Sequence, residues 1–460
     1  MFPDLPLPVV DVLRRLSGAG HQAAIVGGAV RDRLLGVASD DGDWDVATSA
    51  VPEAVVALLA GATWDNRFGT VTLLGPPSVE ITSFRTEAGY RDARRPDEVR
   101  FGASLDEDLA RRDLTVNAIA WVPDDLESGN GHLVDPFGGQ SDLEAKLLRA
   151  VGDPDARFGE DALRLVRTAR LAGQLGFTIE DRTDAAIRRL AASVATVSGE
   201  RVRDELQRML DEPEPSIGLR QLERLGLLAV VLPELAALRG IPQDKALPGD
   251  ALDHSLRAVD AVPPGDPALQ FAALLHDIGK AVTLADGHFI GHDRVGADLA
   301  AAVLDRLRLS RATAAAVVRA VRHHMYAYEP GWSDAAVRRF IRRVGDADLP
   351  LLFALRRADD VASGVEGPGS ELQVELERRV AAELEHSPDL LRHRRLAIDG
   401  DDVQRVLEAG PGPAIGAVMD RLVEAVIEDP SLNTRETLLE LVREVGSGAV
   451  PDGTGLDGTG

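Results

Sequence analysis

A chain of 460 residues exceeds what one hydrophobic core supports, so roughly two to four domains are expected. The sequence contains no cysteine, which excludes disulfides, thiolate metal sites and a cysteine nucleophile. Any bound metal must therefore use histidine or carboxylate ligands. The net charge of −24 disfavours a general nucleic-acid-binding protein, which usually carries excess positive charge, although a local basic groove is compatible with it.

The ends and the hydropathy pattern predict no membrane association. Residues 1–4 lack the charged start and apolar core of a signal peptide. The sequence has no run of about 18 apolar residues, so no membrane-spanning helix is expected. We therefore expect a cytoplasmic protein with no membrane partner, and the sequence indicates no obligate protein partner.

The element pattern changes along the chain. Short apolar runs bounded by turn residues predict strands at 23–26, 44–46, 69–74 and 79–84. Residues 30–35 predict a helix, and the Arg-rich segment 86–101 predicts a mobile loop. From about residue 154 onward, apolar residues recur at helical spacing. The fold class is therefore α+β: an N-terminal mixed α/β part with a small β-sheet, followed by an all-helical part.

The most informative feature is a pair of carboxylates, Asp43 and Asp45, that follows a Gly-Gly turn. Strand side chains alternate faces, so both carboxylates point the same way. Like charges about 4 Å apart repel by roughly 4 kcal/mol at an effective dielectric near 20, so the pair needs a cation. Paired oxygens suit Mg²⁺, and the turn at Gly27 and Gly28 offers backbone N–H groups to phosphate. These features favour phosphoryl or nucleotidyl transfer.

Two later segments extend this set. Glu80 lies mid-strand, where it can supply a third carboxylate to the metals; the alternative is a structural ion pair. Residues 111–118 bring cations, a carboxylate and an amide into one turn. The forked donors of arginine suit a triphosphate, and Asp113 and Asn117 can bind a ribose hydroxyl. An isolated Asp-x-Asp usually lies in a solvated turn, but the ordered set is far more specific.

An arginine-rich segment follows. Four charged residues recur every third position, which places them on one side of a predicted helix: Asp161, Arg164, Arg167 and Arg170. A carboxylate accepts from the exocyclic amine of cytosine or adenine, and arginine donates to the adjacent ring nitrogen. Uracil and guanine would leave buried groups unpaired, at roughly 1–3 kcal/mol each. The alternative is a solvated amphipathic helix with an i, i+4 pair from Glu160 to Arg164.

A second candidate metal site lies farther along the chain. Six of the ten histidines lie between residues 254 and 324. Imidazoles and carboxylates from successive helices can enclose a divalent metal and activate water. Imidazole ligands favour Ni²⁺, Co²⁺, Mn²⁺ or Fe²⁺ over Mg²⁺. A His-Asp dipeptide such as His276-Asp277 is by itself usually a chance surface feature, but here further histidines flank it.

The motifs at 27–32, 43–48 and 111–118 resemble those of class II tRNA nucleotidyltransferases and bacterial poly(A) polymerases, a superfamily that includes the CCA-adding enzymes. Three further segments are closer to CCA-adding members: 67–71, 80–85 and 90–96. The resemblance implies that Asp43 and Asp45 bind two Mg²⁺ ions and that Glu80 assists catalysis. It implies nucleotide binding by Gly28, Arg31, Arg112, Asp113, Asn117, Asp161, Arg164, Arg167 and Arg170. Motif-like residues 198–206 include Glu200 and Arg201, which are expected to brace the base-selecting helix.

The string Leu-His-Asp-Ile-Gly-Lys at 275–280 resembles the HD phosphohydrolase superfamily. The resemblance implies a single-metal site formed by His254, His276, Asp277 and Asp359. Three other histidines would permit a second metal: His292, His323 and His324. Hydrolysis is one expected activity of this site, and the alternative is a helical scaffold that supports RNA.

The resemblances imply five regions: a nucleotidyltransferase head at 1–145, a helical neck with the base-selecting helix and an RNA-binding region at 146–240, an HD-type helical domain at 241–385, a C-terminal helical region at 386–445 and a disordered tail at 446–460. The implied function is template-independent addition of CCA to the 3′ end of tRNA from CTP and ATP. Alternatives that share the head are an A-adding enzyme, a CC-adding enzyme and a poly(A) polymerase. Alternatives of another class are an HD metal-dependent phosphohydrolase and a non-catalytic RNA-binding scaffold, and the complete head motifs disfavour both.

Overall fold

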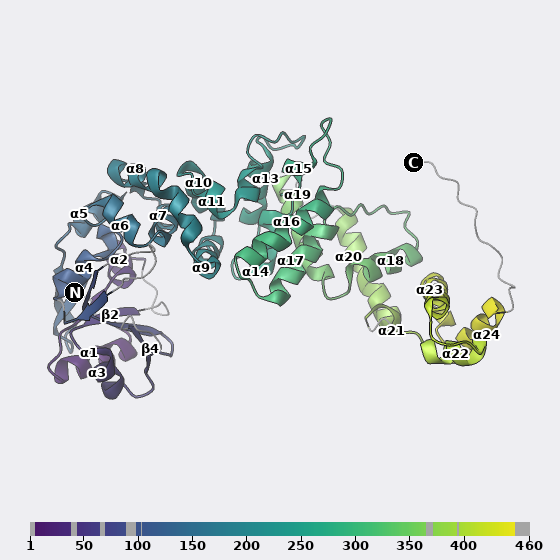
Figure 1. Ribbon diagram of the computed structural model, residues 1–460, viewed down its shortest axis with the longest axis horizontal. Helices are drawn as coiled ribbons and strands as arrows, with labels where there is room; N and C mark the ends of the chain where they lie inside the picture. The colour runs from purple at the N-terminus through teal and green to yellow at the C-terminus, as the bar shows by residue number, and fades with distance from the viewer. Residues whose placement is uncertain are drawn as a thin grey trace. The chain divides into compact units, whose positions relative to one another are not determined.

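The computed structural model describes residues 5–37, 44–64, 70–88, 98–102, 104–364, 371–392 and 395–446. The chain divides into two compact units: residues 1–237 with 303–309, and residues 238–302 with 310–460. In Figure 1 the strands of the sheet lie in the purple and blue N-terminal part, and helices follow from teal to yellow. The α+β fold class predicted from the sequence is confirmed.

A seven-stranded sheet forms the centre of the head, in the order β3-β4-β5-β2-β1-β8-β9. Its strands are β1 (Ala23–Val26), β2 (Trp44–Thr48), β3 (Thr63–Trp64), β4 (Thr70–Leu73), β5 (Val79–Ser83), β8 (Ala120–Asp125) and β9 (Asn130–Val134). β2 and β5 run parallel, and the other neighbours in this sheet are antiparallel. All four residues of β1 are buried, as expected for an apolar run at the centre of a sheet. The predicted strands are confirmed.

Helices of the head pack on this sheet. They are α1 (Leu7–Gly18), α2 (Gly28–Leu35), α3 (Pro52–Leu58), α4 (Leu105–Ala110) and α5 (Gly139–Glu144), with a 3₁₀ turn at Thr115–Asn117. The buried residues of α1 recur at helical spacing, which gives it one apolar face. α2 confirms the predicted helix and contacts β1 and β2. Ser104 and Glu107 form a capping box that starts α4 directly before the turn with the paired arginines.

The segment predicted as a mobile loop, 86–101, has strands at both ends. β6 (Arg85–Ala88) pairs antiparallel with β7 (Glu98–Phe101) in a separate two-stranded sheet. The prediction is therefore wrong at both ends. Residues 98–101 alternate polar and apolar side chains, a period-2 pattern that the high charge of the segment concealed. Residues 89–97 lie outside the described part of the chain.

The neck is helical. Its elements are β10 (Leu147–Leu148), α6 (Pro154–Glu160), α7 (Leu163–Leu175), β11 (Thr178–Ile179), α8 (Asp181–Leu190), a 3₁₀ segment (Ala191–Thr196), α9 (Gly199–Leu210), α10 (Pro215–Arg224), α11 (Leu228–Val231) and α12 (Pro233–Ala236). α7 packs on both α9 and α10. α7 and α10 approach closely at two glycines, because a Cβ on Gly173 would lie 2.7 Å from the Cα of Gly218.

The second unit is built from helices joined by loops, and no named strand lies among its described residues. Its helices are α13 (Ala251–Asp260), α14 (Pro267–Leu275), α15 (Lys280–Thr283), α16 (His292–Arg306, whose end belongs to the first unit), α17 (Arg311–His323), α18 (Asp334–Val344), α19 (Leu349–Ala362), α20 (Glu371–His386), α21 (Pro388–Leu391), α22 (Gly400–Leu407), α23 (Pro413–Glu428), a 3₁₀ turn (Pro430–Leu432) and α24 (Arg435–Gly446). α13, α14, α17 and α19 pack against one another, and α18 packs on α20 and α23. Among the described helices, none combines the length and apolar composition needed to cross a membrane. The predicted tail lies outside the described residues from 447 onward.

Candidate functional site

A cavity of about 690 Å³ opens where the head sheet meets α7. Most of the head and neck residues singled out in the sequence line it: Gly28, Arg31, Asp45, Glu80, Arg112, Asp113, Asn117, Arg164, Arg167 and Arg170. Asp43 lies outside the described residues, so its part in the site stays a prediction. Asp161 is not among the described residues that line the cavity. The structure thus gathers carboxylates and arginines from segments far apart in the sequence.

Two carboxylates lie side by side on the floor of this cavity. Asp45 on β2 is directly opposite Glu80 on β5 in the parallel ladder, so both side chains leave the same face of the sheet. Asp45 is half-buried and Glu80 is exposed. Like charges directly opposite on neighbouring strands destabilise a sheet, and oxygen-rich carboxylate sets are what Mg²⁺ binds. This donor set therefore fits the divalent metals expected from the sequence.

The backbone passes between a carboxylate and a cation at Gly27. Gly27 has a φ of +73°, which favours glycine. A Cβ there would lie 2.8 Å from Nη1 of Arg112 and 3.0 Å from Oδ2 of Asp45. α2 begins at the next residue, Gly28, and its first N–H groups lack partners within the helix. A helix N-terminus beside an arginine is a favourable position for phosphate.

Arg31 is buried and held by two side chains. Its Nε and Nη2 donate to the carboxylate of Asp32 at 2.8 and 3.0 Å, and its Nη1 donates to Oδ1 of Asn117 at 2.7 Å. The amide of Asn117 in turn donates to Oδ1 of Asp113 at 3.1 Å. Both Asp113 and Asn117 are buried, so in the free protein they orient Arg31 at the cavity wall. The guanidinium of Arg31 is thus positioned before any ligand arrives.

The structure corrects the predicted ridge of four charged residues. Asp161 has an extended backbone, with φ −151° and ψ 106°, and α7 begins only at Leu163. Its Oδ1 accepts from the N–H of Leu163 at 3.1 Å, and Arg201 binds both of its oxygens at 3.1 and 2.6 Å. Aspartate competes for backbone donors in this way and so favours the start of a helix over its interior. Only the three arginines share the α7 ridge.

Arg164 joins α7 to the head. Its Nη1 donates to Glu160 at 2.6 Å and to the carbonyl of Arg157 at 2.9 Å. Its Nη2 donates to the carbonyl of Arg111 at 2.9 Å, in the turn that carries Arg112. The i, i+4 pair considered in the sequence therefore exists, but the side chain is only 12% exposed, so it is not a solvated surface pair.

The sequence analysis missed Glu205 on α9. Its side chain is 2% exposed and accepts from Nε of Arg167 at 3.0 Å and from Nε of Arg170 at 2.7 Å. Burial alone would raise the pKa of Glu205, but the charges and hydrogen bonds of Arg167 and Arg170 outweigh it and lower that pKa. Arg167 also lies 3.5 Å from Oδ2 of Asp113. Glu205 is therefore the carboxylate that holds the arginine ridge in place.

A sequence signal for Glu205 exists. The residue shares the buried face of α9 with Val202, Leu206 and Met209, and a glutamate on an apolar helix face needs a partner. The brace expected from Glu200 and Arg201 is formed only in part. Arg201 binds Asp161, as described above, whereas Glu200 is exposed.

In the second unit, six ligand side chains form two groups of three. Ligand atoms within each group lie within 4.8 Å of one another: His254, His276 and Asp359 in one, and Asp277, His292 and His324 in the other. They come from α13, α16 and α19 and from the turns that follow α14 and α17. His323, expected together with His324, belongs to neither group. The structure thus brings the four residues of the expected quartet together and places His292 and His324 beside them.

Asp277 lies between the two groups. Its Oδ2 is 3.2 Å from Nε2 of His276 and 3.5 Å from Nε2 of His254. Its Oδ1 is 3.5 Å from Nε2 of His292 and 3.7 Å from Nε2 of His324. Burial would raise the pKa of Asp277, but the adjacent His276 and further partners hold it well below its ordinary value. A carboxylate in this position can bridge two metal ions.

The ring nitrogens fit metal ions. Nε2 of His292 and Nε2 of His324 are buried without a hydrogen-bond partner among the described residues. The Nδ1 atoms of the same rings lie 2.8 Å from the carbonyl of Phe289 and 2.6 Å from that of Val321. Each carbonyl accepts the Nδ1 proton, which leaves a lone pair on Nε2. A buried nitrogen without a partner costs about 1–3 kcal/mol, and a metal ion removes that cost.

Two lysines flank these ligands. Lys280 Nζ lies 2.6 Å from Oδ2 of Asp277, and Lys245 Nζ lies 3.5 Å from Oδ1 of Asp359. Both lysines line a cavity of about 650 Å³ together with Phe289 and several of the metal-site residues. The cavity therefore combines a metal-ligand cluster with positive charge that suits an anionic substrate.

Comparison with known proteins agrees with this geometry. Family models match three segments: the poly A polymerase head domain at 23–149, the probable RNA and SrmB-binding site of polymerase A at 176–238, and the HD domain at 256–364. The A-adding tRNA nucleotidyltransferase of Deinococcus radiodurans is 38% identical over 429 residues, which are 88% of this chain and 91% of that protein. The chain belongs to the tRNA nucleotidyltransferase family.

Two further relatives agree with the family over nearly the whole chain. The CCA-adding enzyme of Latilactobacillus sakei is 32% identical over 441 residues, covering 94% of this chain and 97% of that enzyme. The crystal structure of the Bacillus stearothermophilus CCA-adding enzyme in complex with CTP covers 96% of this chain and 97% of its own, with a TM-score of 0.68 and 28% identity. The family resemblance predicted from the sequence is therefore confirmed, including the HD domain.

The contacts at Gly27 generate a prediction. Gly27→Ala places a Cβ against Arg112 and Asp45, so we expect nucleotide incorporation to fall at least about tenfold, because a small misplacement of catalytic groups costs this much. Gly20→Ala is the matched control: it also has a positive φ, +86°, but nothing lies within 4 Å of its Cβ. Incorporation rates at matched folded fractions measure the difference. Equal losses in the two variants would show that backbone strain alone matters at Gly27.

Proposed function

We propose that this chain adds C, C and A to the 3′ end of tRNA, using CTP and ATP and releasing pyrophosphate. The observation that carries the proposal is the single cavity that gathers a carboxylate pair, a helix N-terminus and the arginines of α7. Relatives named CCA-adding enzyme that align over nearly the whole chain support it.

The head residues have separate roles in this reaction. Asp43, Asp45 and Glu80 would hold two Mg²⁺ ions, which would supply activation of the RNA 3′-hydroxyl and stabilisation of the leaving pyrophosphate. The N–H groups at the start of α2, from Gly28 onward, bind the triphosphate. The guanidinium of Arg31 is already fixed by its protein partners, so little ordering cost remains when it binds phosphate.

Base choice belongs to the start of α7 in this proposal. Asp161 accepts from the amine of cytosine or adenine, and Arg164 donates to the ring nitrogen. In the free protein Arg201 binds Asp161, and Glu160 binds Arg164. A correct base would therefore replace protein partners of both residues, whereas a base with the opposite donor pattern could not replace them. Arg167 and Arg170, fixed by Glu205, extend this surface along the helix.

The named relatives differ in the number of nucleotides they add. The Deinococcus relative is named an A-adding enzyme, and the Latilactobacillus relative a CCA-adding enzyme. Three head segments are closer in sequence to CCA-adding enzymes: 67–71, 80–85 and 90–96. They favour CCA addition, which predicts incorporation of both C and A. Incubation of tRNA lacking CCA, and of tRNA ending in CC, with each labelled nucleotide separately and together distinguishes the possibilities. Addition of A only to the CC-ended tRNA would replace this proposal with the A-adding reaction.

A substitution at the carboxylate pair tests the chemistry. Asp45→Asn keeps the side-chain shape but removes a negative charge beside Glu80, so we expect loss of both C and A incorporation by at least about a thousandfold. Glu53→Gln, an exposed position on α3, is the control. Radiolabel incorporation into tRNA and circular dichroism measure activity and folding. Near-normal incorporation by Asp45→Asn at saturating Mg²⁺ would remove Asp45 from the metal site.

A second activity is proposed for the HD domain. The six ligands would hold two divalent transition-metal ions, from among Ni²⁺, Co²⁺, Mn²⁺ and Fe²⁺, with Asp277 between them. Such ions activate water at neutral pH, which suits hydrolysis of a phosphoester. Lys245 and Lys280 would attract its phosphate. The observation that favours this activity is the pair of buried imidazole nitrogens, on His292 and His324, that have no hydrogen-bond partner in the described part of the chain.

Metal content tests this site independently of nucleotide addition. We expect purified protein to hold about two transition-metal ions per chain after supplementation, and His324→Ala to hold about one, because one group of three loses a ligand. His288→Ala, which lines the same cavity but belongs to neither ligand group, should keep both ions. Elemental analysis measures the metal content, and phosphoesterase assays measure the activity. Nucleotide addition should remain unchanged in both variants. Protein that holds no transition metal even after supplementation would make the HD domain a scaffold.

A further inference from the structure

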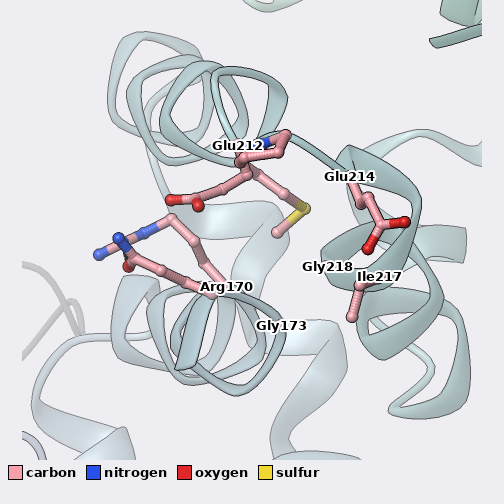
Figure 2. Close-up of a pocket in the computed structure, with 9 residues that line it drawn as sticks. Arg170, Gly173, Glu212, Glu214, Ile217 and Gly218 are labelled. Atoms are coloured by element: carbon pink, nitrogen blue, oxygen red, sulfur yellow. Dashed lines mark hydrogen bonds between the residues drawn. The ribbon is translucent and has the colours of Figure 1, made fainter. Parts of the chain in front are cut away.

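A small side pocket adjoins the main cavity on the neck. It has a volume of about 160 Å³, less than a quarter of the main cavity, and the two share Arg170 and Gln174. Figure 2 shows this pocket, with Arg170 among its lining residues. Its walls come from α7, α9, α10 and the segment between α9 and α10. Apart from Arg170, the residues that line this pocket have no role in the chemistry described above.

Glycines shape the pocket. α7 and α10 cross with Gly173 against Gly218, where neither position has space for a side chain. A Cβ on Gly218 would lie 2.6 Å from Cγ of Met209, so the methionine packs directly on the α10 backbone. Met209 and Ile217 supply apolar walls on either side of this crossing. A flat ring can pack against such walls, and sulfur–aromatic contacts are favourable.

Two charged groups face the same space in Figure 2. Arg170 donates through Nε to Glu205 and through Nη1 to Gln174, and no protein acceptor among the described residues binds its Nη2. Glu212 is half-buried, and its carboxylate has no hydrogen-bond partner in the described part of the chain. Burial raises the pKa of Glu212 more than the charge of Arg170 lowers it. The pocket thus presents one acceptor and one donor that protein groups do not use.

We propose that this side pocket binds an amino-bearing base of the RNA 3′ end, foremost the cytosine already added, beside the position of the incoming nucleotide. The inference rests on the proposed addition of CCA to tRNA. The Glu212 carboxylate accepts from the exocyclic amine of cytosine, and Arg170 Nη2 donates to a ring acceptor. Uracil places a carbonyl where cytosine has its amine, so its oxygen would face a carboxylate without a bridging proton.

The walls favour a base of RNA over a second nucleoside triphosphate. Glu212 and Glu214 both line the pocket, and two carboxylates repel a triphosphate group. A base that enters from the main cavity leaves its phosphates outside, near the arginines of α7. Because the pocket opens beside Arg170, an RNA end in the main cavity can reach it without crossing α7.

Binding of two RNA minihelices tests the proposal. The minihelices are identical except that one ends in CC and the other in UU, and fluorescence anisotropy measures each dissociation constant without nucleotide. We expect wild-type protein to bind the CC end about tenfold more tightly, the value of one hydrogen bond to a charged group. Glu212→Gln should reduce this preference to within about twofold by weakening CC binding. Glu214→Gln, an exposed carboxylate on the same pocket, should keep the preference.

The outcomes separate this proposal from the proposed function. Equal binding of the two ends by wild-type protein, or an unchanged preference in both Glu212→Gln and Glu212→Ala, would overturn the pocket assignment. The same RNAs incubated with ATP report addition independently. Addition of A to the CC end with no binding preference would refute the pocket and leave the proposed function intact. A preference lost in Glu212→Gln, in protein that adds no nucleotide, would support the pocket and refute the function.

Discussion

The structure of the catalytic half depends on the buried carboxylate of Glu205. Arg164, Arg167 and Arg170 project from one side of α7, and like charges at this spacing destabilise a helix. Glu205 reaches across from α9 and binds two of these arginines, at 3.0 and 2.7 Å from their Nε atoms. Leaving a buried charge unpaired costs about 3–5 kcal/mol, so Glu205, whose side chain is 2% exposed, depends on these two arginines. The packing of α7 on α9 and the position of the arginine ridge therefore have one cause.

From Glu205 a series of polar contacts leads back into the head. Arg167 lies 3.5 Å from Asp113, which accepts from Asn117, which in turn accepts from Arg31. Arg31, proposed to bind the triphosphate, and Arg167, which extends the proposed base-facing surface, thus belong to one set of polar contacts. Each cation in this set is oriented by a protein anion or amide in the free protein. Such preorganisation lowers the cost of ordering arginine side chains when an anionic substrate binds.

Much of the head was predictable from the sequence, and the failures have physical reasons. Short apolar runs between glycine turns identify the strands, and strand pairing then brings Asp45 beside Glu80. The role of Glu205 was not predictable from spacing, because its partners lie more than 30 residues away on another helix. Asp161 was wrongly assigned to the helix because periodicity alone does not reveal the break between α6 and α7. Its side chain accepts from the N–H of Leu163, the first residue of α7. The sequence offers two adjacent histidines to this cluster, and only the packed helices select His324 over His323.

Base discrimination in a Glu205→Gln variant tests the central claim most directly. Glutamine keeps the shape of the side chain but removes the charge that holds Arg167 and Arg170. The account predicts that kcat/KM for CTP and ATP relative to UTP and GTP falls about tenfold, while Glu200→Gln, an exposed change on the same helix, keeps the native ratio. An unchanged ratio in folded Glu205→Gln protein would contradict the account and reduce the buried carboxylate to a packing element of the neck.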